Sequence, residues 1–239
     1  MNESTWRPRL VEGALIVTSI LLAFAIDAAW GERTERLRRD ALFAALEREM
    51  AIASDERDRV AGYHALGQEA SAALLRLDVG APLDRLSAAV VDSLLQLAYN
   101  STATFDAPSG ALDGLLLSSN LDLIEDEALL IELTSYPGLV SDLGREQGYL
   151  VEVAFRLLDY LGAEGVDVSL LNDSAIEPSE RSVPWSLGRT GAYAIVGEPQ
   201  FRGLLNELWW RYGNSLERLD EMRPTIDQIR VLSGLGRTH

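Results

Sequence analysis

An uncharged apolar stretch near the amino terminus constrains this chain more than any other feature. Residues 13–26 (GALIVTSILLAFAI) contain no charged side chain, but a segment of that length is too short to cross a bilayer. With its flanks the stretch becomes residues 10–30, and a helix of that length measures about 31 Å, close to the hydrocarbon thickness. Trp6 and Trp30 lie about 36 Å apart along such a helix, where aromatic belts are expected. The sequence therefore predicts a transmembrane helix over residues 10–30, after a short tail formed by residues 1–9.

A cleaved signal peptide is the alternative interpretation of the same stretch. Its small-residue cleavage site would have to lie in residues 25–29 (AIDAA), which match the expected pattern only loosely. The Arg-rich sequence after Trp30 continues a helical pattern, whereas a cleavage region is extended. These features favour an anchor that is retained.

One stripe of the predicted anchor combines acidic and small side chains. At 100° per residue, four positions fall within about 60° of Glu12 on the helix surface. They are Ser19, Ala23, Asp27 and Trp30. Small residues let helices approach closely, and polar groups within a membrane usually face protein, so the stripe predicts a face for another transmembrane helix. The alternative is that both acids only reach outward to the membrane surface.

The rest of the chain is strongly acidic. The net charge is −16, with 21 basic residues, all of them Arg, against 37 acids. Residues 1–40 hold six of each, so the remainder carries 15 Arg and 31 acids (21 − 6 and 37 − 6). Such a surface repels nucleic acid and could attract a basic soluble protein, although the charge could equally serve solubility alone. Cysteine is absent, which excludes disulfides and thiolate chemistry.

The remaining sequence predicts an all-α domain over residues 31–239. The helical pattern that follows the anchor continues as a stalk, and later segments suggest a helical bundle with one irregular loop region at about 162–200. Pro224 is expected to kink the last helix or to start another that ends at Gly234. A turn is expected at 136–138 (YPG), and a short helix near 189–196. The predicted longer helices cover residues 33–77, 82–99, 109–119, 122–135, 139–161 and 200–223.

The sequence contains no recognisable catalytic, cofactor or metal site. Its histidines are His64, within a predicted helix, and His239, the last residue; neither has neighbours at metal-ligand or triad spacing. The acidic run at residues 125–127 is expected to favour the start of a helix. We therefore predict no catalytic residue, no bound metal and no cofactor.

Two groups of residues are candidate interfaces. Trp209 and Trp210 point about 100° apart on a helix, so both cannot fill one core face. Exposed Trp beside Arg is favoured at interfaces; alternatively, one Trp caps the core and the other packs on the irregular loop. The second group is the set of arginines that follows the anchor, Arg33, Arg36, Arg38 and Arg39, among Glu32, Glu35 and Asp40.

The stalk raises the possibility of self-association through a coiled coil. Apolar residues recur along it, but Arg48, Asp55 and Arg59 are expected to interrupt a heptad seam. We therefore expect the anchor stripe to meet a different protein.

Four segments resemble a broad group of uncharacterised bacterial single-pass membrane proteins. These have an apolar helix that ends in an acid or amide before Trp, then an Arg/Glu-rich helix, as in residues 25–30 (AIDAAW) and 31–49 here. Residues 104–112 (TFDAPSGAL) and 118–124 (SSNLDLI) also resemble the group. The resemblance implies an anchor in the bacterial inner membrane with a cytoplasmic amino terminus and a periplasmic domain. A simple count of arginines on either side of the anchor favours the opposite orientation.

These features predict a non-enzymatic accessory subunit of a larger integral-membrane assembly. Its partners would be other membrane subunits, with lipid around the anchor. Respiratory and photosynthetic complexes contain such subunits, by analogy only. The alternatives are a self-associating sensor or envelope interaction module and, less in keeping with the sequence, a membrane-anchored hydrolase.

Overall fold

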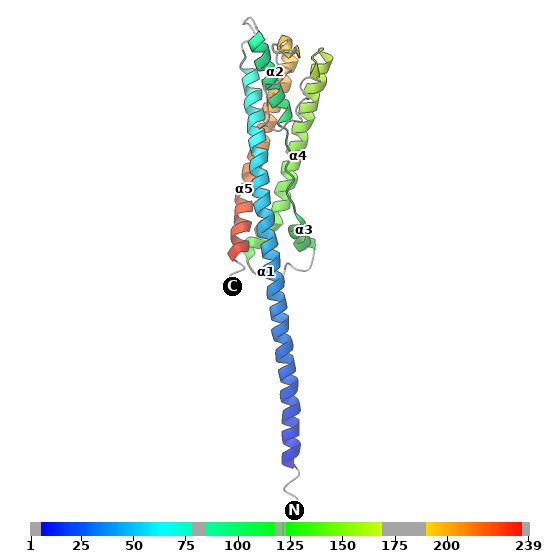
Figure 1. Ribbon diagram of the computed structural model, residues 1–239, viewed down its shortest axis with the longest axis vertical. Helices are drawn as coiled ribbons and strands as arrows, with labels where there is room; N and C mark the ends of the chain where they lie inside the picture. The colour runs from blue at the N-terminus through cyan, green and yellow to red at the C-terminus, as the bar shows by residue number, and fades with distance from the viewer. Residues whose placement is uncertain (1–5, 78–84, 118–120, 122, 169–189, 236–239) are drawn as a thin grey trace, which may run out of the picture.

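The computed structural model describes residues 6–77, 85–117, 121, 123–168 and 190–235, and in these ranges the fold is all-α with no strand. Figure 1 shows a slender helical bundle with one helix projecting far beyond it. The elements are α1 (Trp6–Leu75), α2 (Arg85–Asn100), α3 (Gly110–Leu117), α4 (Glu127–Ala163), the short 3-10 helix η4 (Ala192–Ile195) and α5 (Pro199–Leu235).

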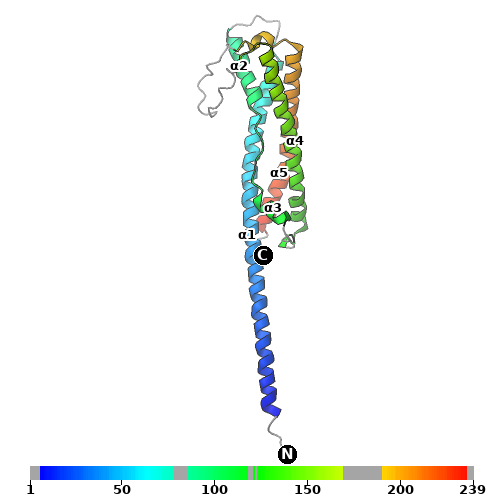
Figure 2. The same ribbon diagram turned by 90° about the vertical axis from the view of Figure 1, so that its right-hand side faces the viewer.

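The bundle consists of four segments that alternate in direction along the chain, and each of them is called a leg below. In Figures 1 and 2, α1 runs away from the anchor, α4 runs in the same direction, and α5 returns so that its end lies near the middle of α1. The remaining leg is composite: α2 descends from the far end, an extended segment continues downward, and α3 lies at the end nearer the anchor. Helix α5 packs against both α1 and α4.

Helix α1 joins the predicted anchor to the domain without a break. It is long and apolar enough to cross a membrane, and its apolar window is exposed throughout. The first buried side chain of the helix is Phe43, about 20 Å of helix beyond Trp30. The predicted stalk, which runs directly into the domain, is therefore confirmed, and the apolar first half of α1 is a single candidate membrane span.

All three long helices bury residues alternately every three and every four positions, which is a heptad repeat. The predicted interruption of this seam is wrong, because Arg48, Asp55 and Arg59 lie outside it and are exposed. On α1 the buried series begins at Phe43 and includes polar residues among the apolar ones. It consists of Phe43, Leu46, Met50, Ala53, Arg57, Val60, His64, Gly67, Ser71 and Leu74.

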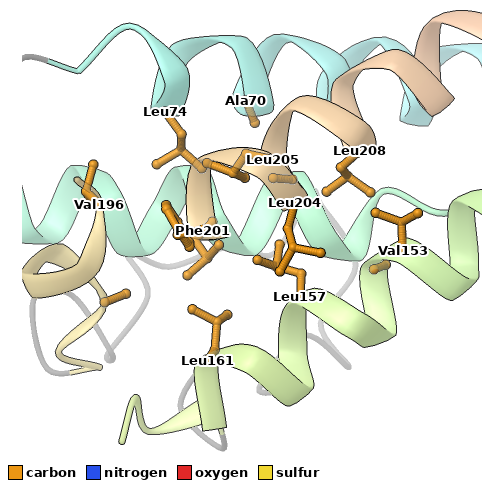
Figure 3. Close-up of a cluster of buried hydrophobic side chains, with 14 of the residues drawn as sticks. Ala70, Leu74, Val153, Leu157, Leu161, Val196, Phe201, Leu204, Leu205 and Leu208 are labelled. Atoms are coloured by element: carbon orange, nitrogen blue, oxygen red, sulfur yellow. The ribbon is translucent and has the colours of Figure 1, made fainter. Parts of the chain in front are cut away.

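The core is divided into two apolar clusters. The distal cluster, part of which Figure 3 shows, is far from the anchor and includes Ala70, Leu74, Leu95, Leu150, Leu157, Leu161, Phe201, Leu205, Leu208 and Tyr212. The proximal cluster is nearer the anchor and includes Phe43, Leu46, Met50, Val60, Leu112, Leu129, Leu133, Leu143, Leu219, Met222 and Ile226. The predicted bundle core is thus present, but in two parts.

The turn predicted at 136–138 is wrong. Helix α4 continues through it with Pro137 inside, and Tyr136 is buried in the proximal cluster. Proline removes one helical hydrogen bond, but here the buried face continues on both sides and holds the helix together. Pro224 likewise lies inside α5, which reaches Leu235 as one helix. The irregular region is described only over 162–168 and 190–200, where η4 matches the short helix expected near 189–196, while 169–189 lie outside the described residues.

The acidic run at 125–127 does begin a helix, as predicted. The Asp126 carboxylate accepts hydrogen bonds from the backbone N–H groups of Ala128 (2.9 Å) and Leu129 (3.2 Å) at the start of α4. This is N-capping, which satisfies donors that the helix itself leaves free.

Replacing Asp126 by Ala is therefore expected to lower the free energy of unfolding by about 1 kcal/mol, because two helix donors lose their acceptor. Chemical unfolding followed by circular dichroism measures the loss. Asp126→Ser is the matched control, since serine caps about as well and should restore most of the stability. Equal stability of the alanine and aspartate forms would contradict this assignment of the cap.

Candidate functional site: a clamped strap at the centre of the bundle

The five residues of the predicted anchor stripe lie on the part of α1 that projects from the bundle. Glu12, Ser19, Ala23, Asp27 and Trp30 are all exposed, and no described element packs on them. The Ser19 hydroxyl donates to the carbonyl oxygen of Leu15 (2.8 Å), as expected for a polar group in an apolar helix. The stripe therefore presents a small, internally satisfied surface at Ser19 and Ala23.

The arginines after the anchor are held in different ways. Arg36 pairs with Glu32 along α1 (2.9 Å), whereas Arg39 reaches Glu125 just before α4 (3.2 Å). Arg33 and Arg38 are exposed and form no ion pair with the described residues. Arg39 thus ties the stalk to the base of the bundle, and Arg33 and Arg38 remain the accessible cations of the group.

Both tryptophans of the aromatic patch are partly exposed, and the alternative in which one of them packs on the irregular loop involves residues 169–189, which lie outside the described residues. Leu208 and Tyr212 fill that face of α5, and Trp209 and Trp210 are 40% and 50% exposed. The Arg211 guanidinium lies over the rings of Trp210 (4.8 Å) and Tyr149 (4.7 Å). Both indole rings are therefore accessible at the surface of α5.

Trp209 also borders an open groove of about 640 Å³ at the distal end of the bundle. Small side chains of α1, Ala72 and Ala73, line it together with Leu94 and Leu97 of α2. Gln68, Glu69 and Arg76 of α1 supply the polar groups of its lining.

The feature that sequence reasoning missed is the extended segment between α2 and α3, residues 101–109, which we call the strap. Its side chains alternate, with Ala103, Phe105 and Ala107 packed against the proximal cluster and Thr104 and Asp106 exposed. The strap therefore has the alternation of a β-strand although no other strand lies beside it among the described residues.

Side chains of the helices bind the backbone of the strap in place of neighbouring strands. His64 Nε2 donates to the carbonyl oxygen of Ala103 (2.7 Å), and the Phe105 N–H donates to Gln147 Oε1 (3.0 Å). At the outer edge, Arg59 donates to the Thr104 carbonyl oxygen and Glu56 accepts from the Asp106 N–H, each at 3.4 Å. Four backbone groups that a strand would leave unpaired are thus satisfied.

A further side chain fixes the lower end of the strap. The Glu49 carboxylate accepts from the N–H groups of Ala111 (2.5 Å) and Leu112 (3.1 Å) in the first turn of α3. Glu49 of α1 therefore caps a helix other than its own.

Three buried polar residues form a central polar layer between the two apolar clusters: His64 on α1, Gln147 on α4 and Ser215 on α5. On each helix the residue lies between a member of the proximal cluster and a member of the distal cluster. Burial lowers the pKa of His64 to about 4, and the charge of Arg59 acts in the same direction against the hydrogen bond to Ala103. His64 is therefore neutral at physiological pH, with the proton on Nε2, because a carbonyl oxygen only accepts.

Tyr212 closes this layer on its distal side. Its ring lies against His64 with a centroid separation of 5.5 Å, and its hydroxyl donates to the carbonyl oxygen of Ala98 in the last turn of α2 (2.7 Å). The ring passes over Gly67, where a side chain would collide with it. Tyr212 thereby holds the point at which α2 ends and the strap begins.

The arrangement clamps the strap and the end of α2 to the other helices. A neutral imidazole, an amide and a phenol hold backbone groups, and each uses its hydrogen-bonding capacity to fix chain position. Within the described residues, no three His, Asp or Glu side chains gather as metal ligands. Polar residues at core positions of a heptad, such as His64 and Gln147, are the sequence signal that could have located this layer.

Comparisons with protein-family models, with curated proteins and with solved structures found no match to this chain.

Proposed function

We propose that this protein is a non-enzymatic accessory subunit of a larger integral-membrane assembly, and that it holds a helical bundle at a fixed height above the membrane. The observation that carries the proposal is α1. A single helix is both the candidate membrane span and a core member of the bundle, and the first buried residue on it is Phe43.

The anchor surface supports a membrane partner. The projecting part of α1 is uncovered, and on it Ser19 and Ala23 lie between the acids Glu12 and Asp27 on one stripe. In lipid, close packing of helices depends on small residues, and acids within or near the apolar layer favour protein neighbours. The exposed Arg33 and Arg38 would meet neighbouring subunits where these leave the membrane.

The stalk supports a hetero-assembly over a coiled-coil homodimer. Its heptad seam is already filled by α5 and the other legs of the same chain, so the surface that a dimer would use is occupied. Self-association through the anchor stripe remains the alternative, since that stripe does not depend on the seam.

We further propose that the amino terminus is cytoplasmic and the acidic domain periplasmic, following the layout of the bacterial proteins that the sequence resembles. An acidic domain there could attract a basic soluble protein by electrostatic steering.

The expected result of mild-detergent solubilisation from native membranes is that the chain migrates with companion membrane proteins. Size separation followed by mass spectrometry identifies them. Migration as a monomer or as a homodimer would contradict the proposal.

The variant Ser19→Leu with Ala23→Leu should release the chain from these companions, because two leucines keep the helices apart. Ala14→Leu with Ala25→Leu is the matched control: it places the same bulk about 200–220° from Glu12, on the opposite face. Retention of companions by both variants would move the contact to the bundle.

A further inference from the structure

We propose that one ordered water molecule is an integral part of this protein, bound by His64, Gln147 and Ser215 in the central polar layer. All three residues are at most 2% exposed. His64 Nδ1, Gln147 Nε2 and Ser215 Oγ are each buried and find no hydrogen-bond partner among the described residues. Protein interiors satisfy such groups with water, which typically makes about three hydrogen bonds to them.

The strap places two of the three residues side by side. His64 binds the carbonyl of Ala103 and Gln147 binds the N–H of Phe105. In an extended chain, the carbonyl of one residue and the N–H of the residue two positions further on point to the same side. His64 and Gln147 therefore approach the strap from one direction, with their remaining polar atoms inside the bundle.

Helix α5 brings the third residue to the same level. The rings of His64 and Tyr212 are in contact, with centroids 5.5 Å apart. Ser215 follows Tyr212 by three positions, so it lies one turn further along the same face of α5. That turn leads from the distal toward the proximal cluster, to the boundary where His64 and Gln147 are found.

The chemistry of the three atoms selects a neutral molecule that both donates and accepts. Nδ1 of His64 carries a lone pair, because the ring proton is on Nε2 and is given to Ala103. Gln147 has its amide orientation fixed by Phe105 N–H, so its NH₂ group can only donate. A cation would face the Gln147 donors and an anion the His64 lone pair, whereas water can donate to Nδ1, accept from Nε2 and bond the Ser215 hydroxyl.

The test is nuclear magnetic resonance on the full chain in mild-detergent micelles, with ¹⁵N-labelled histidine. His64 and His239 are the only histidines of the chain, and His239→Ala leaves a single imidazole in the spectrum. The first expected result is a cross-relaxation peak from a long-lived water to the Cε1 proton of His64, which lies next to Nδ1. The second is an Nδ1 resonance shifted upfield from that of a bare imidazole nitrogen.

Ser215→Ala is expected to abolish the water peak and to move the Nδ1 resonance toward the bare value, because the water loses one of its three partners. Ser233→Ala is the matched control: it removes another buried hydroxyl of α5 without a partner among the described residues, beyond the central layer, and should change neither signal. The water peak should persist in Tyr212→Phe, and this result excludes relay of the signal through the neighbouring phenol hydroxyl. A wild-type spectrum without the water peak and with a bare Nδ1 would overturn the proposal, as would a Ser215→Ala spectrum that keeps both signals.

Discussion

Replacing Gly67 by Ala is expected to lower the free energy of unfolding by about 2–3 kcal/mol, although alanine is the better helix former. A Cβ at Gly67 would lie 2.3 Å from Cζ of Tyr212 and 2.6 Å from its hydroxyl oxygen. The phenol ring has no space into which to retreat, since Tyr212 is fully buried and its hydroxyl is bonded to Ala98. The strain would therefore pass to α5 or to the end of α2.

Gly62→Ala is the matched control, because it makes the same substitution in the same helix, α1. A Cβ at Gly62 meets no atom within 4 Å, so this variant should gain up to about 1 kcal/mol from helix propensity. Chemical unfolding in mild detergent, followed by near-ultraviolet circular dichroism, measures both. In a Tyr212→Leu background the penalty of Gly67→Ala should largely disappear, because the colliding ring is gone. Equal stability changes at the two glycines would show that Tyr212 does not lie over Gly67.

Acidification from pH 6.5 to pH 5 is expected to lower the free energy of unfolding by about 1.5 kcal/mol through His64 alone. The pKa of His64 is about 4 in the folded chain, against an ordinary value of 6.5, because burial disfavours the charged ring. Below pH 6.5 the unfolded chain binds a proton that the folded chain does not, so stability falls as the pH falls. The loss continues until the pH reaches the folded pKa.

The control for this pH dependence is a variant in which residue 64 cannot bind a proton between pH 6.5 and pH 5. His64→Gln keeps a donor for the Ala103 carbonyl and removes the ionisation, so the slope of stability against pH between 6.5 and 5 should flatten in a His239→Ala background. Unfolding titrations at several pH values measure the slope. The window stays above the ordinary range of the carboxylates, such as Glu56, whose pKa is lowered chiefly by its hydrogen bond from Arg59. An unchanged slope in the variant would exclude His64 as the titrating group.

The sequence was sufficient to predict the apolar N-terminal helix, the stalk and the all-α class, because each depends on local pattern. Residues 10–30 are apolar by composition, and the helical spacing of the stalk continues past Trp30. The role of the acidic run at the start of α4 was also predictable, since an acid at a helix start interacts with its own backbone, although the predicted helix began at 122 and α4 begins at Glu127. Such features need no knowledge of the partners that a helix meets.

The errors arose where a long-range contact decides the outcome. Pro137 signals a turn locally, but the heptad face on either side keeps α4 continuous. The seam of α1 was missed because its register runs through Arg57 and His64, which are polar, and leaves Arg48 and Asp55 outside. The strap could not be predicted from its own residues, because its backbone partners come from α1 and α4, at least 39 positions away for His64 and Gln147.

Because α1 is continuous, the number of residues between the predicted anchor and the bundle determines the rotation of the bundle about the helix axis. Because no joint separates Trp30 from Phe43, each residue inserted there would turn the bundle by about 100° about the helix axis and raise it by about 1.5 Å. Seven inserted residues would return it to within about 20° of its original heading, about 10 Å higher. The angular position of the predicted anchor therefore fixes that of the aromatic surface around Trp210. A neighbour that binds one face of the anchor also sets the direction in which this aromatic surface points.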